Sequence, residues 1–345
     1  MKDSKQVEAS YSRRGMLLSA AGAMATAMLA KPAILFGDPN AAPSSGAHPH
    51  AAFQDRLTGP IYSNPCPFTA DLQPDDAAQK KGIDRAIAAG IGVFATTAGN
   101  SKYPTLSFHE IKHVNRVMVE AVDRRALAIM STGDWELDQT IDFAKFCRGS
   151  SADALQVLIP VKLREPEQED AAVDFYRRVG DAAALPLVLH GKFTDSLLTK
   201  LVGLDCVAAM KEDHALEDFV RQQIDHGQRI TIFGGGGENR FYIGWPYGAK
   251  AYYSTYSTFA PDIAAKVWKV IQSGDIRAAA VLTAKFDYPY IRRFNHGVWH
   301  ATLELFDIGT RHVRPPHKVL DDAQMAELKA FFESQGVKPY VYKNA

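Results

Sequence analysis

The chain has 345 residues, of which 46% are hydrophobic and 23% are charged, a composition typical of a globular protein with one large domain or two modest ones. This composition excludes a disordered chain, a collagen-like chain and a disulfide-dense secreted protein. Lysine plus arginine and aspartate plus glutamate each total 39, so the formal net charge is zero and no basic excess exists to bind nucleic acid. The three cysteines, Cys66, Cys147 and Cys206, lack the paired spacing of a zinc or redox site, and we expect no essential disulfide.

Residues 1–45 have the pattern of an export signal. Arg13 and Arg14 directly precede an apolar stretch, residues 16–30, as in a twin-arginine signal. The stretch has about 15 residues and a bilayer-spanning helix needs about 20, so we expect no permanent membrane anchor. We expect residues 1–45 to be a signal and spacer for the twin-arginine export machinery, residues 46–58 to be a linker, and the mature protein to be periplasmic or otherwise exported. The alternative is a chance arginine pair on an N-terminal helix.

From residue 59 onwards, short apolar runs alternate with amphipathic stretches. The runs are nearly all apolar, which is typical of strands buried on both faces. The predicted strands cover residues 91–95, 127–130, 154–159, 185–189, 207–210, 230–233 and 251–253. The predicted helices cover residues 75–89, 107–122, 136–146, 170–183, 215–225 and 261–272. Roughly seven or eight β-α units at this spacing predict a (β/α)8 TIM barrel over residues 59–274, with a doubly wound sheet as the alternative.

The C-terminal part of the chain has helical patterns and no further strand. These patterns cover residues 276–284, 298–307 and 322–334. We therefore expect residues 275–345 to form a helical extension that caps the barrel.

The ends of the predicted strands carry the residues with chemical potential, and active sites of (β/α)8 barrels lie at those ends. Thr96 and Thr97 follow one strand, and their hydroxyls are suited to hold a carboxylate. His190 ends another strand, and Lys211 follows the apolar run 207–210. Burial would lower the pKa of Lys211 toward that of a usable amine nucleophile. These groups predict a Schiff-base enzyme; the alternative is a solvated lysine paired with Glu212 or Asp213.

Two further motifs suggest other chemistry. His109, Glu110 and His113 have the H-E-x-x-H spacing of zinc hydrolases. They lie on a predicted outer helix, away from the strand ends, so a zinc hydrolase is the weaker alternative. The glycine run 234–237 lacks the lysine and hydroxyl residue of a nucleotide loop, and we interpret it as a place where the backbone approaches a ligand.

Several blocks in a consistent order resemble the dihydrodipicolinate synthase and N-acetylneuraminate lyase family of class I aldolases, over residues 59–336. The blocks are N-P-C-P-F at 64–68, A-T-T-A-G at 95–99, L-P-L-V-L at 185–189, M-K-E at 210–212, F-G-G at 233–235, G-A-K-A at 248–251 and V-R-P-P at 313–316. The resemblance implies that Lys211 forms an imine with a 2-oxo acid, that Thr96 and Thr97 hold its carboxylate, and that the Tyr253 carbonyl lines the imine. It also implies no metal or organic cofactor, and a homo-oligomer such as a dimer or tetramer.

The departures from the family pattern bear on the substrate. The family's G-T-T-G-E reads A-T-T-A-G here, and His190 replaces its proton-relaying tyrosine, a role that imidazole can fill. The family arginine that anchors a second carboxylate falls near Asp195, so we do not expect the lysine-biosynthetic enzyme. We expect a lyase or aldolase with Lys211 and His190 as catalytic residues and with Thr96, Thr97, Tyr253 and Gly234 as substrate-binding residues. The alternative is a non-catalytic periplasmic barrel that binds a small acid or a sugar.

Overall fold

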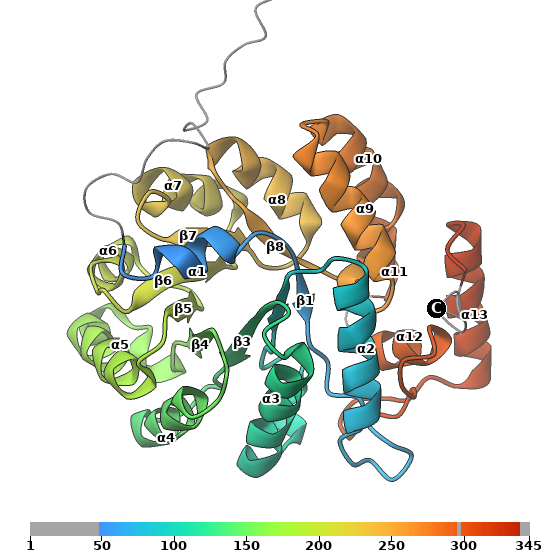
Figure 1. The fold of residues 1–345 in the computed structure, drawn as a ribbon, viewed down its shortest axis with the longest axis horizontal. Coiled ribbons are helices and arrows are strands. Elements are labelled where there is room, and N and C mark those ends of the chain that lie inside the picture. Colours follow the sequence, from blue (N-terminus) through green and yellow to red (C-terminus); the bar gives the residue numbers. More distant parts are fainter. Residues whose placement is uncertain (1–47, 295–297, 339–345) are drawn as a thin grey trace, which may run out of the picture. The chain divides into compact units, whose positions relative to one another are not determined.

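Eight short apolar segments form parallel strands that close into a barrel in the order β1 to β8 (Figure 1). This computed structural model describes residues 48–294 and 298–338, so the predicted export signal lies outside the described residues. The strands are β1 (Gly59–Ser63), β2 (Val93–Ala95), β3 (Leu127–Ser131), β4 (Ala154–Leu158), β5 (Leu187–His190), β6 (Val207–Glu212), β7 (Thr231–Gly234) and β8 (Ala251–Ser254). Ile61 pairs with Val93 on one side and with Tyr253 on the other, which closes the ring. The predicted (β/α)8 barrel is confirmed, and the doubly wound sheet is excluded.

A helix follows each strand and covers the outside of the barrel. These helices are α2 (Asp76–Ala88), α3 (Phe108–Val122), α4 (Leu137–Arg148), α5 (Glu169–Ala183), α6 (Asp195–Val202), α7 (Leu216–His226), α8 (Glu238–Gly244) and α9 (Pro261–Gln272). Side-chain caps fix several starts: the Asp75 carboxylate accepts from the Ala78 amide at 3.0 Å, and Ser107 forms a capping box with Glu110. The pattern did not predict α6 or α8.

The segment expected as a linker contains a helix, α1 (Ala51–Arg56). Phe53 and Leu57 are buried among the side chains that fill the barrel interior. Gln54 donates from Nε2 to the carbonyl oxygens of Ala208 and Arg229, both at 2.9 Å. The helix therefore closes the end of the barrel where the strands begin (Figure 1).

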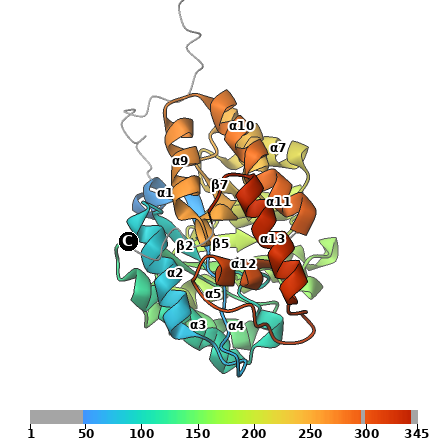
Figure 2. The same ribbon diagram turned by 90° about the vertical axis from the view of Figure 1, so that its right-hand side faces the viewer.

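The helical extension is confirmed and comprises α10 (Ile276–Lys285), α11 (Asp287–Phe294), α12 (Trp299–Leu305) and α13 (Asp322–Ser334), which lie together in Figure 2. Aromatic rings join it to the segment after β8. Ring centroids lie 5.2 Å apart for Phe259 and Phe306 and 5.4 Å apart for Phe259 and Tyr290. Each such pair contributes about 0.5–1.5 kcal/mol beyond its buried area. Across the described residues, no helix is long and apolar enough to span a membrane.

Candidate active site

A cavity of about 300 Å³ lies at the ends of the strands opposite α1. Its walls come from six of the eight strands or the loops after them, and from α12 of the extension. The lining residues are Ser63, Thr97, Gly99, Asn100, His190, Lys211, Asp213, Gly236, Gly237, Tyr253, Ser254, Thr255 and Trp299. Four of the predicted site residues, Lys211, His190, Thr97 and Tyr253, therefore meet in one place.

Lys211, His190 and Asp213 form a triangle of close contacts in this cavity. Lys211 Nζ lies 3.0 Å from His190 Nε2 and 2.6 Å from Asp213 Oδ2, and the histidine and carboxylate atoms are 3.3 Å apart. The Lys211 and His190 side chains are each 13% exposed. Because β5 and β6 are neighbours, with His190 paired to Lys211 in register, the sheet itself brings the two side chains together. Lys211 is paired with Asp213, as one sequence interpretation expected, but it is mostly buried.

The charges in the triangle are set by burial and by mutual contact. Burial and the positive charge of Lys211 lower the pKa of His190, so its imidazole is neutral at pH 7. Burial alone would raise the pKa of Asp213, but its contacts with His190 and Lys211 hold that pKa well below its ordinary value. Asp213 is therefore a carboxylate at neutral pH.

A hydrogen-bond network through Gln156 surrounds His190, and the contact with Lys211 assigns the imidazole proton. The Ser131 hydroxyl donates its one proton to the Thr96 carbonyl oxygen at 2.5 Å, so Ser131 Oγ accepts from Gln156 Nε2 at 2.9 Å. The same Nε2 lies 3.5 Å from His190 Nδ1, and Gln156 Oε1 accepts from the Tyr253 hydroxyl at 3.3 Å. The Lys211 ammonium can only donate, so Nε2, 3.0 Å from Nζ, is the acceptor and the neutral imidazole carries its proton on Nδ1. His190 can therefore take a proton from Lys211 and return it in a later step.

The two predicted threonines have different surroundings. Thr97 lines the cavity, and its Oγ1 accepts from the Asn100 amide at 3.2 Å, which leaves its own proton available. The Thr96 side chain is fully buried and donates to Asn115 Oδ1 at 2.7 Å. The structure does not bring Thr96 into the cavity, because its hydroxyl is used inside the barrel wall. Ser63 lies at the cavity wall instead of Thr96, and its Oγ accepts from Asn100 Nδ2 at 2.7 Å.

Gly234, predicted as a binding residue, is the last residue of β7 and does not line the cavity. The next glycines do: Gly236 and Gly237 have φ of 75° and 123°, values that glycine adopts without strain. Tyr253 contributes its ring, whose centroid lies 5.4 Å from Lys211 Nζ. The glycine run thus approaches the cavity, two residues later than predicted.

A buried carboxyl group supports the wall behind Ser254. Glu238 is 2% exposed, accepts from Ser254 Oγ at 2.7 Å through one oxygen, and accepts from Thr283 Oγ1 at 2.9 Å through the other. Burial and the charge of nearby Asp287 raise the pKa of Glu238. These contacts fix Ser254 at the cavity wall and link it to α10 of the extension.

The strand end that carries Lys211 is held from its other side. The fully buried Glu212 pairs with Arg240, and it accepts from His214 Nδ1 at 2.8 Å. His214 Nε2 in turn accepts from the Phe193 amide at 3.0 Å. This cluster ties the loops after β5, β6 and β7 together, so the backbone at Lys211 has little freedom to move.

The H-E-x-x-H residues lie on α3, outside the barrel. Glu110 contacts Arg314 at 2.7 Å, and this hydrogen bond is the main cause that lowers the pKa of Glu110 to about 2. His113 Nε2 contacts Asp76 at 2.8 Å, while His109 is exposed. Among the described residues no group of three or more His, Cys, Asp or Glu is placed to hold a metal ion. The motif therefore serves helix capping and surface pairing.

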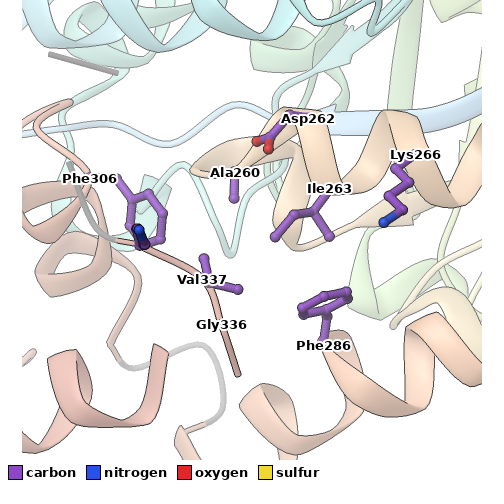
Figure 3. Close-up of a pocket in the computed structure, with 9 residues that line it drawn as sticks. Ala260, Asp262, Ile263, Lys266, Phe286, Phe306, Gly336 and Val337 are labelled. Carbon is purple, nitrogen blue, oxygen red and sulfur yellow. The ribbon is translucent and has the colours of Figure 1, made fainter. Parts of the chain in front are cut away.

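A second cavity, of about 330 Å³, lies between α9, α10 and the end of the described chain (Figure 3). Ile263, Phe286, Phe306 and Val337 give it an apolar lining, with Lys266 and Asp262 at its edge. It shares no residue with the cavity around Lys211. Of these two cavities, the first therefore contains both the nucleophile and the histidine beside it.

The sequence profile of the Dihydrodipicolinate synthetase family matches residues 57–335, which include every strand and every residue that lines the Lys211 cavity. The chain belongs to this family. Members of the dihydrodipicolinate synthetase family are lyases of the class I aldolase type. The resemblance drawn from the sequence motifs is therefore confirmed.

Named relatives and solved structures in the family are also similar to this chain. The 4-hydroxy-tetrahydrodipicolinate synthase of Anaplasma marginale is 24% identical over 231 residues, which cover 65% of this chain and 76% of the relative. The Escherichia coli prophage protein YagE, solved with pyruvate, gives a TM-score of 0.74 at 22% identity and covers 81% of this chain and 99% of its own. N-acetylneuraminate lyase of Mycoplasma synoviae gives 0.72 at 18% identity, with 81% and 98% covered. These structures share the barrel fold.

Four residues at the site were not predicted as functional: Ser63, Gln156, Asp213 and Trp299. Ser63 ends β1, the strand that the pattern missed. Asp213 entered the sequence analysis only as a surface partner of Lys211, and Gln156 lies within a predicted strand whose apolar character hid it. Trp299 comes from the extension, far from the barrel in sequence. The spacing of Lys211 and Asp213, two residues apart at a strand end, was the one available signal, since such side chains share a face of the strand.

Proposed function

We propose that this dihydrodipicolinate synthetase family member is a Schiff-base-forming lyase or aldolase, which acts on a 2-oxo acid of the pyruvate type or on its aldol adduct. The observation that carries the proposal is the Lys211 amine, which lies in a cavity at the strand ends with the His190 imidazole 3.0 Å away. Pyruvate is the first ligand to test, because the similar YagE structure was solved with it.

Imine formation uses Lys211 Nζ as the nucleophile. The ammonium group first passes one proton to the neutral imidazole of His190, whose Nε2 lies 3.0 Å away, and the nitrogen lone pair then attacks the ketone carbon. The C–N bond forms, the C=O π bond breaks, and one proton moves from the nitrogen to the oxygen to give a carbinolamine. The His190 imidazolium then donates its proton to the departing hydroxyl, which leaves as water, while the nitrogen lone pair forms the C=N bond of the iminium.

The iminium then acts as the electron sink for the carbon–carbon step. In cleavage, the hydroxyl proton of the aldol adduct passes to a base, the carbon–carbon bond breaks, and its electron pair forms the enamine as the aldehyde leaves. His190, neutral again once it has returned its proton in dehydration, is a base at the right place to take the proton. The resulting imidazolium returns that proton to the enamine at carbon, and water hydrolyses the imine to free Lys211.

Hydroxyl groups provide the anchor for the substrate carboxylate. The Thr97 and Ser63 hydroxyls both line the cavity, and each has a proton left to donate. The two residues replace the predicted pair of Thr96 and Thr97 in this role.

The charges of the cavity favour an aldehyde without a second carboxylate. Among the described residues that line it, Lys211 is the one lysine or arginine. Asp195, at the place of the family arginine, is 67% exposed and pairs with Arg221 on α7. A second carboxylate would therefore meet Asp213 without a compensating cation, which disfavours the lysine-biosynthetic substrate.

The test is a panel of 2-oxo acids, with pyruvate first, added to the mature protein and followed by borohydride. We expect one reduced ligand mass per chain by intact-protein mass spectrometry, and no effect of a metal chelator. A ligand that raises the melting temperature but leaves no covalent mass would instead support a non-catalytic binding barrel. Loss of activity with the chelator would support the zinc alternative.

We propose that the protein is exported through the twin-arginine route, on the strength of Arg13 and Arg14 before the apolar stretch 16–30. Changing both arginines to lysine should leave the protein in the cytoplasm with its fold and labelling unchanged, because the receptor of this route reads the pair. Cell fractionation with immunodetection measures the result, and a change of Lys2 and Lys5 to arginine is the control. The double variant in the periplasm at wild-type levels would contradict the proposal.

A further inference from the structure

Asp213 lies in the Lys211 cavity, and the mechanism above gives it no role. It follows β6 directly, two residues after Lys211. One of its oxygens, Oδ2, contacts both Lys211 Nζ at 2.6 Å and His190 Nε2 at 3.3 Å. A single carboxylate oxygen therefore touches the atom on which the imine forms and the proton donor beside it.

The loop after β7 leaves room for this carboxylate at Gly235. A Cβ atom on Gly235 would lie 1.9 Å from Asp213 Oδ1 and 2.9 Å from its Cγ. Gly235 is not among the positive-φ glycines, so its backbone conformation does not require glycine. The reason for glycine here is space: any side chain would push the Asp213 carboxylate away from Lys211.

We propose that Asp213 is the counterion of the Lys211 iminium, a fixed negative charge that stabilises the positive charge on Nζ. This inference rests on the proposed function, because the imine is its subject. In a partly desolvated cavity, an opposite charge in hydrogen-bond contact stabilises a cation far more than it does in water. The protonated imine is the form that accepts the electron pair of the breaking carbon–carbon bond, so its stability bears directly on the reaction.

The groups around Asp213 suit a permanent charge. Lys211 on β6 and His190 on β5 face it, and they hold its pKa well below the ordinary value against the effect of burial. Tyr253 on β8 stays neutral, because burial and the Asp213 charge raise its pKa. Arg164, beyond β4, acts on His190 through its charge. With His190 and Tyr253 neutral, the lysine cation and the Asp213 anion balance each other.

Removing the charge should have two effects of opposite sign. The carboxylate stabilises the Lys211 ammonium as well as the iminium, so in Asp213→Asn the free amine becomes available at lower pH. The iminium loses the same support and should accumulate less. An opposite charge at this range shifts titrations by about 1–3 pH units. We therefore expect the acid limb of the labelling profile to move down by about one pH unit or more, and maximal labelling to fall.

The measurement is labelling by pyruvate and cyanoborohydride across pH 5 to about 9, followed by intact-protein mass spectrometry. Gly235→Ala should move the acid limb in the same direction, because it displaces the carboxylate without removing it. Two matched controls should keep the wild-type profile. Asp134→Asn removes an exposed carboxylate at the same end of the barrel, and Gly92→Ala adds a Cβ at an exposed glycine with nothing within 4 Å.

The outcomes distinguish the counterion role of Asp213 from the proposed Schiff-base function. Labelling of Asp213→Asn that falls by one factor at every pH, with the acid limb in place, contradicts the counterion role and indicates a packing role. An acid limb that moves in Asp134→Asn as far as in Asp213→Asn also contradicts it, because any carboxylate would then serve. Wild-type protein that is not labelled at any pH contradicts the proposed function, and the counterion role with it.

Discussion

Lys211→Arg should abolish both the borohydride-stable adduct with pyruvate and any release of a 2-oxo acid from an aldol adduct. Arginine keeps a positive charge beside Asp213, but its guanidinium remains protonated and offers no lone pair to attack a ketone. The adduct is measured by intact-protein mass spectrometry, and product release by a coupled assay for the 2-oxo acid. The expected loss is complete, because every step of the mechanism passes through the nitrogen of Lys211.

Lys192→Arg is the matched control for this variant. Lys192 is exposed, lies two residues after His190 at the same end of the barrel, and should be replaceable without loss of label or turnover. A Lys211→Arg protein that still gains one reduced pyruvate would place the imine on another lysine. That result would contradict the assignment of the nucleophile.

His190→Phe should lower turnover by about 10² or more while the pyruvate adduct still forms, since general acid–base help is worth about 10²–10⁴. Phenylalanine keeps a planar ring at the strand end, but it cannot donate to the departing hydroxyl. Single-turnover kinetics of the carbon–carbon step, together with the trapped adduct, measure the two effects separately. His226→Phe, at the end of α7, is the control and should match the wild type. An unchanged rate in His190→Phe would mean that this histidine only packs against Lys211.

The barrel could be predicted because its strands are short, apolar and regularly spaced. The strand that the pattern missed is β1, whose sequence begins Gly59-Pro60, two residue types that are depleted in strands. It forms nonetheless, because β2 and β8 each leave an edge that only a strand between them satisfies. Tertiary context thus decides this element, and local propensity does not.

The short helices were missed for a related reason. α6 and α8 have too few turns to show a clear apolar period, and α8 begins directly after the glycine run 234–237. The expected linker contains α1 because Phe53 and Leu57 find an apolar site in the barrel interior. Nothing in the local sequence of that segment shows that such a site exists.

The site residues that could be predicted from the sequence are those that lie at strand ends. Lys211 and His190 follow from adjacent strands, whose register the fold class fixes. Thr96 and Thr97 could not both face the cavity, because neighbouring residues in extended backbone point to opposite sides. The structure directs Thr97 to the cavity and Thr96 to Asn115. The position of Trp299 at the cavity depends on how the extension folds back onto the barrel, and no sequence pattern near Trp299 predicts this.

Peptide mapping by tandem mass spectrometry, after treatment of the wild-type protein with pyruvate and borohydride, shows directly whether Lys211 forms the imine. We expect one reduced pyruvate on the peptide that contains Lys211, with fragment ions that place it on that side chain. A protein that binds pyruvate, as shown by a raised melting temperature, but carries no adduct on Lys211 would contradict this expectation.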